Sequence, residues 1–305
     1  MRKHIINHSN AEQHNFRLGL FYAFGGTALF ALKSIFIKLA YAQGVDTVTL
    51  LTLRMLVAAP FYLAVLLWLF YKIKVVRPIN RDLLLIMLLG ALSYYASSYF
   101  DMQGLNYISA QLERLMLYTY PLMTALLGWL LFREVLTRRI ILALVLTYSG
   151  VLLLYAYEAK LAGNKVGLGV LLVTISAIIF AVYLVYSKRV LNRVTSPLFT
   201  SIAMLSATAC VFIHFLFTHP LSALWVNSTA WFYALLLGFF STVLPSFMLT
   251  EAVARIGAAR ASIMGTAGPI ITILLAVVFL AEPFGWAHFA GMALVTFGVS
   301  LLGKK

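Results

Sequence analysis

The chain has 305 residues, of which 63% are hydrophobic and only 10% charged, and its mean hydropathy is +0.96. So apolar a composition excludes an ordinary soluble protein. The formal net charge of +14 does not indicate a nucleic-acid partner, because most of the basic residues lie in short loops, and the single cysteine, Cys210, excludes a disulfide framework.

Apolar stretches follow one another along almost the whole chain, after a polar tail at residues 1–17 that we expect to be retained in the cytoplasm. Each stretch is long enough to cross a hydrocarbon core about 30 Å thick as a helix. We therefore predict an all-α integral membrane protein with ten transmembrane helices, at 18–40, 47–71, 83–103, 111–131, 138–157, 166–187, 196–217, 229–250, 258–280 and 284–302.

Basic residues are distributed unevenly between alternate loops. Of the 23 lysines and arginines, 17 fall in the tails and every second loop, while the opposite loops hold only Lys160 and Lys165. By the positive-inside rule, this bias predicts that both termini lie in the cytoplasm. We expect a multi-pass protein of a bacterial inner membrane.

The sequence repeats itself at an offset of 148 residues. Pro121 is matched by Pro269, Glu134 by Glu282 and Gly150 by Gly298. Two related units, 18–157 and 166–302, are therefore expected. Because each has five predicted helices, the second enters the membrane upside down, which gives the inverted five-helix repeats typical of secondary transporters.

Ionisable side chains inside the predicted spans all belong to the first unit: Lys33, Lys38, Arg54, Asp101, Glu113 and Arg114. Such residues are costly in a membrane and usually face a cavity or one another. One hypothesis is an ion-pair and gating network of Asp101, Glu113 and Arg114, with Lys38 as an anchor near the surface. The two acids leave cations in excess, so Lys33 is the leading candidate for binding a substrate carboxylate. For Arg54, carboxylate binding and pairing with Asp101 are both open.

Hydroxyl groups accompany these charges. In an α-helix Tyr94, Ser98 and Asp101 share one face, at i, i+4 and i+7, with Tyr95 beside them. Tyr118 lies one turn after Arg114. We interpret the tyrosines and Ser98 as lining a substrate cavity, whereas the alternative is ordinary helix packing with hydroxyls bonded across the interface.

Prolines interrupt three spans, at Pro121, Pro245 and Pro269, and each is expected to kink its helix. Paired interruptions in the two units are a pointer to the substrate site of a transporter. Glu134 and Glu282 follow directly on predicted spans, and we expect structural roles for them at helix ends.

Several segments resemble the EamA-type exporters of the drug/metabolite transporter superfamily. They are Leu29–Ser34, Leu50–Arg54, Gly104–Ala110, Tyr120–Pro121, Phe132–Glu134, Ala258–Pro269 and Ala281–Pro283. The resemblance covers nearly all of residues 17–302. It implies two inverted repeats around a central cavity formed by helices 1, 3, 4, 6, 8 and 9, and export of amino acids or other metabolites.

Competing functions differ in the residues they require. A small multidrug-type antiporter needs a glutamate in the first span, where this chain has lysines, although multidrug efflux stays an alternative, as does a carrier of phosphate-ester or nucleotide-type metabolites. No constellation of catalytic side chains, metal ligands or ATP-binding residues is present, so we expect neither an enzyme nor a cofactor. We predict a secondary transporter in the bilayer that exports carboxylate-bearing metabolites by alternating access, as a monomer or a homodimer.

Overall fold

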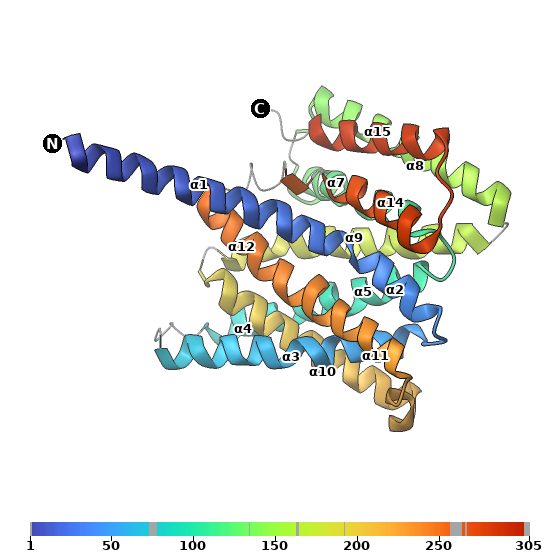
Figure 1. Cartoon of the computed structure of the whole chain (residues 1–305), viewed down its shortest axis with the longest axis horizontal. Helices are drawn as coiled ribbons and strands as arrows, with labels where there is room; N and C mark the ends of the chain where they lie inside the picture. The colour runs from blue at the N-terminus through green and yellow to red at the C-terminus, as the bar shows by residue number, and fades with distance from the viewer. Residues whose placement is uncertain are drawn as a thin grey trace.

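A computed structural model of the chain describes residues 2–72, 78–133, 135–162, 165–191, 193–256, 264–265 and 267–301. Within these ranges the regular structure is entirely helical (Figure 1). Glu134, residues 258–263 and the C-terminal lysines Lys304 and Lys305 lie outside the described residues, so the sequence predictions for them stay predictions.

The first unit runs from α1 to α8. Its helices are α1 (Arg2–Ala31), α2 (Lys33–Tyr41), α3 (Thr47–Lys72), α4 (Asn80–Gly90), η1 (Ala91–Ser97), α5 (Ser98–Gly104), α6 (Ala110–Leu117), α7 (Tyr120–Phe132) and α8 (Arg138–Ala162). The second unit contains α9 (Lys165–Leu191), α10 (Ser196–Thr218), η2 (Leu221–Leu224), α11 (Ser228–Leu235), η3 (Leu236–Val243), α12 (Leu244–Ile256), α14 (Ala267–Leu280) and α15 (Trp286–Ser300).

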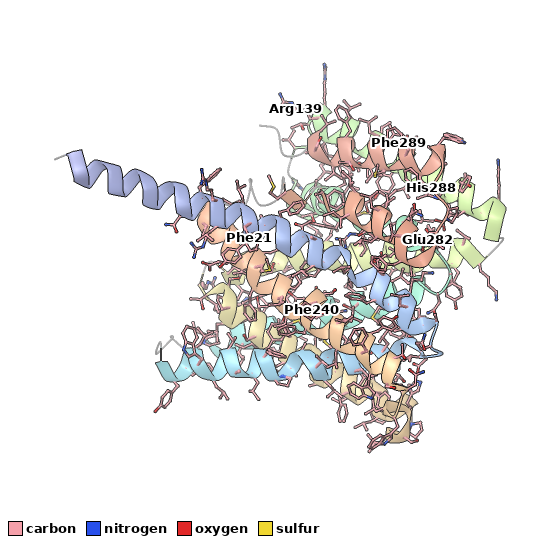
Figure 2. The ribbon with its side chains drawn as sticks, in the orientation of Figure 1. Phe21, Arg139, Phe240, Glu282, His288 and Phe289 are labelled. Carbon is pink, nitrogen blue, oxygen red and sulfur yellow. The ribbon has the colours of Figure 1, made fainter. Side chains whose placement is uncertain are left out.

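Seven helical stretches among the described residues are long and apolar enough to cross a membrane: Asn15–Tyr41, Thr47–Tyr71, Asn80–Gly104, Arg138–Lys160, Lys165–Ser187, Ser196–Thr218 and Ser228–Ala252. Two shorter apolar helices, Ala267–Leu280 and Trp286–Ser300, follow them. The predicted stretch at 111–131 is divided into α6 and α7. Large apolar side chains point outward from the bundle, including Phe21, Phe240 and Phe289, as a surface in contact with lipid requires (Figure 2).

The helices form a bundle with two outer pairs. One outer side is formed by α8 packed on α15, and the opposite side by α3 packed on α10 (Figure 1). Between them, α1 lies along α12, α14 contacts α1, α2 and α6, and α9 contacts α5 and α7. The C-terminal ends of α2, α5, α8 and α14 lie at the same end of the bundle, on the right in Figure 1. We call this end the α14 end.

The crossing of α8 and α15 brings two backbones into contact. A Cβ atom at Gly150 would lie 2.7 Å from the carbonyl oxygen of Gly291, and one at Gly298 would lie 3.0 Å from that of Ala143. Adding 148 to Ala143 and Gly150 gives Gly291 and Gly298, so the contact is reciprocal. Only glycine permits so close an approach at these positions, which explains why the glycine is found in both units.

Candidate functional site

Two π-helical segments interrupt the membrane helices at corresponding places in the two units. They are η1, between α4 and α5, and η3, between α11 and α12. Ser93 in η1 is matched at the 148-residue offset by Ser241 in η3, and both hydroxyl groups are buried without a hydrogen-bond partner among the described residues. Such π segments occur frequently at functional sites, because they widen a turn and redirect its side chains.

The predicted stripe of Tyr94, Ser98 and Asp101, which lies on η1 and α5, is altered by this widened turn. The hydroxyl of Tyr94 lies 3.2 Å from that of Tyr183 on α9, and Tyr95 turns instead toward α10, where its hydroxyl lies 3.1 Å from Nδ1 of His214. Ser98 is half-buried at the start of α5. The stripe therefore divides between several neighbours, as the packing alternative requires for Tyr95, while Tyr94 stays in electrostatic contact with Arg54.

Lys33 and Asp101 form an ion pair in the interior. Lys33 Nζ donates to Oδ2 of Asp101 at 2.6 Å, and the two side chains are 12% and 2% exposed. Lys33 is the first residue of α2, directly after the break at Leu32 that separates α2 from α1. Asp101 thus pairs with Lys33 and not, as one sequence hypothesis had it, with Arg54.

Glu113 lies beside this pair. The hydroxyl of Ser34 donates to Oε2 of Glu113 at 2.5 Å, and both residues are completely buried. The Glu113 carboxyl also interacts electrostatically with Asp101, Lys33 and Arg114. Helices α2, α5 and α6 therefore meet through one polar cluster, in which adjacent residues of α2, Lys33 and Ser34, each hold one acid.

Arg54 lies about 10 Å along α3 from the start of that helix, at 1.5 Å per residue. Only 4% of its surface is exposed. Its Nε donates to Oγ1 of Thr242 in η3 at 2.9 Å, whereas Nη1 has no hydrogen-bond partner among the described residues. The guanidinium thus links α3 to the π segment of the other unit, with an electrostatic interaction but no ion pair to Asp101.

Arg114 is a second arginine with an unsatisfied buried N–H group. Its Nε is buried without a partner, and among the described residues it forms no ion pair within 4.0 Å. A Cβ atom at Gly268 of α14 would lie 3.1 Å from its Nη2, so the guanidinium reaches the neighbouring unit. Tyr118 and Tyr120 interact with it electrostatically.

The three prolines singled out in the sequence lie in the first turns of α7, α14 and α12. Pro121 occupies the first turn of α7, directly after the break from α6 at Tyr118 and Thr119. Pro269 lies in the first turn of α14, and Pro245 follows the junction of η3 with α12. The chain leaves the α-helix between α6 and α7 close to Pro121, and the kink expected at each of the three prolines stays a prediction. Pro60, inside α3, is a further proline that the sequence analysis did not single out.

The predicted excess of cations disappears when the α14 end is included. Glu158 and Glu282 both interact electrostatically with Lys38. Glu158 accepts hydrogen bonds from the hydroxyl and the N–H of Ser109, and Glu282 accepts from the N–H groups of residues 110 and 111, which begin α6. Four cations thus face four acids. Two of these acids, Glu158 and Glu282, lie just beyond the predicted spans and are therefore not in the count of charges inside them.

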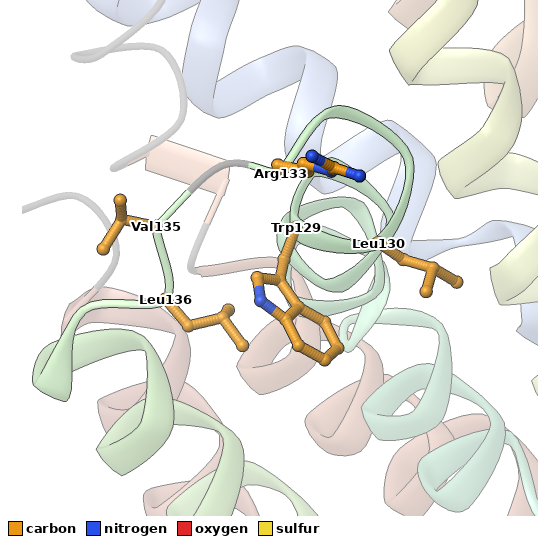
Figure 3. A pocket seen from close by; sticks show the side chains of 5 residues that line it. All are labelled: Trp129, Leu130, Arg133, Val135 and Leu136. Atoms are coloured by element: carbon orange, nitrogen blue, oxygen red, sulfur yellow. The ribbon is translucent and has the colours of Figure 1, made fainter.

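A separate cleft lies at the C-terminal end of α7. It has a volume of about 510 Å³ and is lined by Trp129, Leu130, Arg133, Val135 and Leu136 (Figure 3). Trp129 lies about 14 Å along α7 from its first residue, at 1.5 Å per residue, so this cleft is at the end of α7 away from α6 and Arg114. Among the described residues, no group of three or more His, Cys, Asp or Glu side chains is placed to hold a metal ion.

Comparison with known proteins assigns the family. The sequence profile of the EamA-like transporter family matches residues 17–156 and again residues 167–304. The chain belongs to this family. EamA belongs to the drug/metabolite transporter superfamily, as the sequence resemblance predicted.

Relatives of this EamA protein carry transporter names. It is 30% identical over 287 residues to the uncharacterized transporter YcbK of Bacillus subtilis, an alignment covering 90% of this chain and 89% of the relative. It is 24% identical over 236 residues to YetK of the same organism, covering 74% and 70%. The fold matches a crystal structure with a TM-score of 0.67 at 20% identity, covering 93% and 95% of the two chains. The protein is therefore a multi-pass membrane transporter, and its relatives point away from an enzyme.

Proposed function

We propose that this EamA transporter exports small carboxylate-bearing metabolites, amino acids among them, by alternating access. The observation that carries the proposal is the Arg114 guanidinium, which lies between the two units without an ion pair among the described residues. Buried N–H groups without an acceptor are costly, and a carboxylate matches the planar donor fork of arginine.

The surroundings of Arg114 suit such a substrate. Tyr118 and Tyr120 carry hydroxyl groups and interact electrostatically with the guanidinium, and Gly268, which has no side chain, lets the guanidinium lie against the facing helix. A substrate carboxylate at Arg114 would supply the acceptor that Nε lacks. Arg54, whose Nη1 also lacks a partner, is the second group we assign to the substrate.

Lys33 takes a different role in this proposal from the one its sequence position suggests. Because it is bound to Asp101, it reaches a substrate only after leaving that ion pair. We therefore assign Lys33, Asp101, Glu113 and Lys38 to a gate that closes the α14 end, and Arg114 and Arg54 to binding.

We further propose that the membrane domain has ten helices, with the two units inserted in opposite directions and both termini in the cytoplasm of a bacterial inner membrane. The 17-to-2 distribution of basic residues between loops supports this topology. The reciprocal contact at Gly150 and Gly298 supports a symmetric relation between the units. Alternating access is most simply built from two such halves around a shared site.

The test is transport by the purified protein in liposomes, with a panel of labelled amino acids, other carboxylates, organophosphates and quaternary ammonium compounds. We expect carboxylates to be transported by the wild type and transport to fall at least tenfold in Arg114→Gln. The matched control is Arg193→Gln, because Arg193 is 66% exposed and pairs with Asp82 far from the site. Transport of organophosphates or quaternary ammonium compounds without any carboxylate, or full activity of Arg114→Gln, would contradict the proposal.

A further inference from the structure

Four acids lie around α2 and α6 at the α14 end, and their hydrogen bonding divides them into two kinds. Both carboxyl oxygens of Glu158 accept hydrogen bonds from Ser109, and both oxygens of Glu282 accept from backbone N–H groups of α6. Asp101 and Glu113 differ. Each has one bonded oxygen and one buried oxygen, Oδ1 and Oε1 respectively, without a partner among the described residues.

The two unpartnered oxygens belong to neighbouring side chains. Glu113 interacts with Asp101 directly, Asp101 is 1% exposed, and Glu113 is fully buried. A buried acceptor without a donor is costly, and ionised carboxylates contain no donor to give each other. One proton on either group changes this, because a protonated carboxyl has an O–H that its neighbour accepts.

The cations around the pair do not supply the missing donors. Lys33 is bound to the other oxygen of Asp101, and Arg54 donates its Nε to Thr242. Arg114 interacts with Glu113 electrostatically but forms no ion pair with it, and Lys38 interacts with Glu113 while lying between Glu158 and Glu282. These are the charged groups that face the two acids from α2, α3 and α6. The titratable Tyr41 of α2 also interacts electrostatically with Asp101, but its hydroxyl lies 2.9 Å from that of Thr47 and donates to the Met102 carbonyl oxygen.

We propose that Asp101 and Glu113 share one proton in this conformation, and that its release is the step that opens the gate. This inference rests on the proposed transport function and adds its coupling. When the proton leaves for water, two carboxylates remain side by side, and like charges in a buried site repel. The repulsion separates α5, which carries Asp101, from α6, which carries Glu113. Binding of one proton closes the gate again, so each cycle takes up and releases one proton.

Infrared spectroscopy of the purified protein in liposomes tests the shared proton without any substrate. We expect the pH-difference spectrum of the wild type to contain the carbonyl stretch of one protonated carboxyl group, lost as the pH rises. Glu113→Gln and Asp101→Asn should each remove this band. The matched control, Glu158→Gln, should keep it, because both oxygens of Glu158 already accept hydrogen bonds.

Glu113→Gln is expected to fold, since its amide oxygen accepts from Ser34 and its NH₂ group donates to Asp101 as the shared proton does. If both variants were to misfold, the wild-type spectrum alone decides. The absence of a titrating carboxyl band in the wild type, or a band that persists in both variants, would overturn the inference. If carboxylates were transported but no such band were observed, the proposed function would be supported and the shared proton contradicted. If the band were observed but no carboxylate were transported, the shared proton would be supported and the proposed function contradicted.

Discussion

Removing one member of the Lys33–Asp101 ion pair should destabilise the protein strongly. The side chains are 12% and 2% exposed, so neither charge left alone can recover its hydration. Loss of one partner of a buried ion pair typically costs about 3–5 kcal/mol. In Lys33→Met, Asp101 keeps its electrostatic interaction with Arg54. We therefore expect a loss near the lower limit, about 3 kcal/mol.

A double-mutant cycle measures this interaction. The unfolding free energy of the wild type, Lys33→Met, Asp101→Asn and the double variant would be obtained by denaturant titration in detergent micelles. We expect the double variant to recover at least about 1 kcal/mol relative to the sum of the single losses, because no unpaired charge remains. Arg193→Gln is the control, and its exposed pair with Asp82 predicts a loss of about 0–1 kcal/mol.

The reasoning is refuted by either of two results. Single variants as stable as Arg193→Gln would mean that water reaches the pair. Additive losses in the double variant would mean that Lys33 and Asp101 contribute to stability through other contacts.

Three further predictions concern other parts of the bundle. Thr242→Val should cost about 1–3 kcal/mol in unfolding free energy, because it removes the acceptor of Arg54 Nε, whereas Thr242→Ser should be close to wild type; equal stability of the two variants would contradict this. Gly150→Leu should abolish stable folding, because its Cβ would lie 2.7 Å from the Gly291 carbonyl oxygen. Gly285→Ala should be tolerated, because a Cβ there has no neighbour within 4 Å. Size-exclusion chromatography distinguishes the two outcomes. Reporter fusions after the C-terminal lysine Lys305 should show the cytoplasm and insertions at 222–227 the opposite side, and a reversed C-terminal signal would refute the proposed topology.

Much of the helical architecture could be predicted from hydropathy, since apolar length alone decides whether a segment can cross a membrane. The predicted stretch at 47–71, for example, coincides with the span Thr47–Tyr71. An interruption close to Pro121 could also be predicted, because proline cannot donate the hydrogen bond that continues a helix. The break at Leu32 had no such signal, as neither proline nor glycine stands there.

The charged cluster shows where sequence reasoning ends. The charged residues could be named because charge inside an apolar span is conspicuous. The partners of these charged residues could not be predicted. Lys33 and Asp101 are separated by 68 residues, and the π turn at η1 changes the direction of the side chains between α4 and α5. Glu158 could not be predicted as part of the cluster, because it directly follows a predicted span, where an acidic residue is common. Only the fold shows that it accepts a hydrogen bond from Ser109.

The crossing of α8 and α15 has a consequence for motion. Side chains can change rotamer and allow helices to slide, but a contact of backbone with backbone at Gly150 and Gly291 has no such freedom. In the proposed alternating access we therefore expect the two helices to move as one element. The remaining helices must rock against this element, which makes the α8–α15 pair the fixed frame of the transporter.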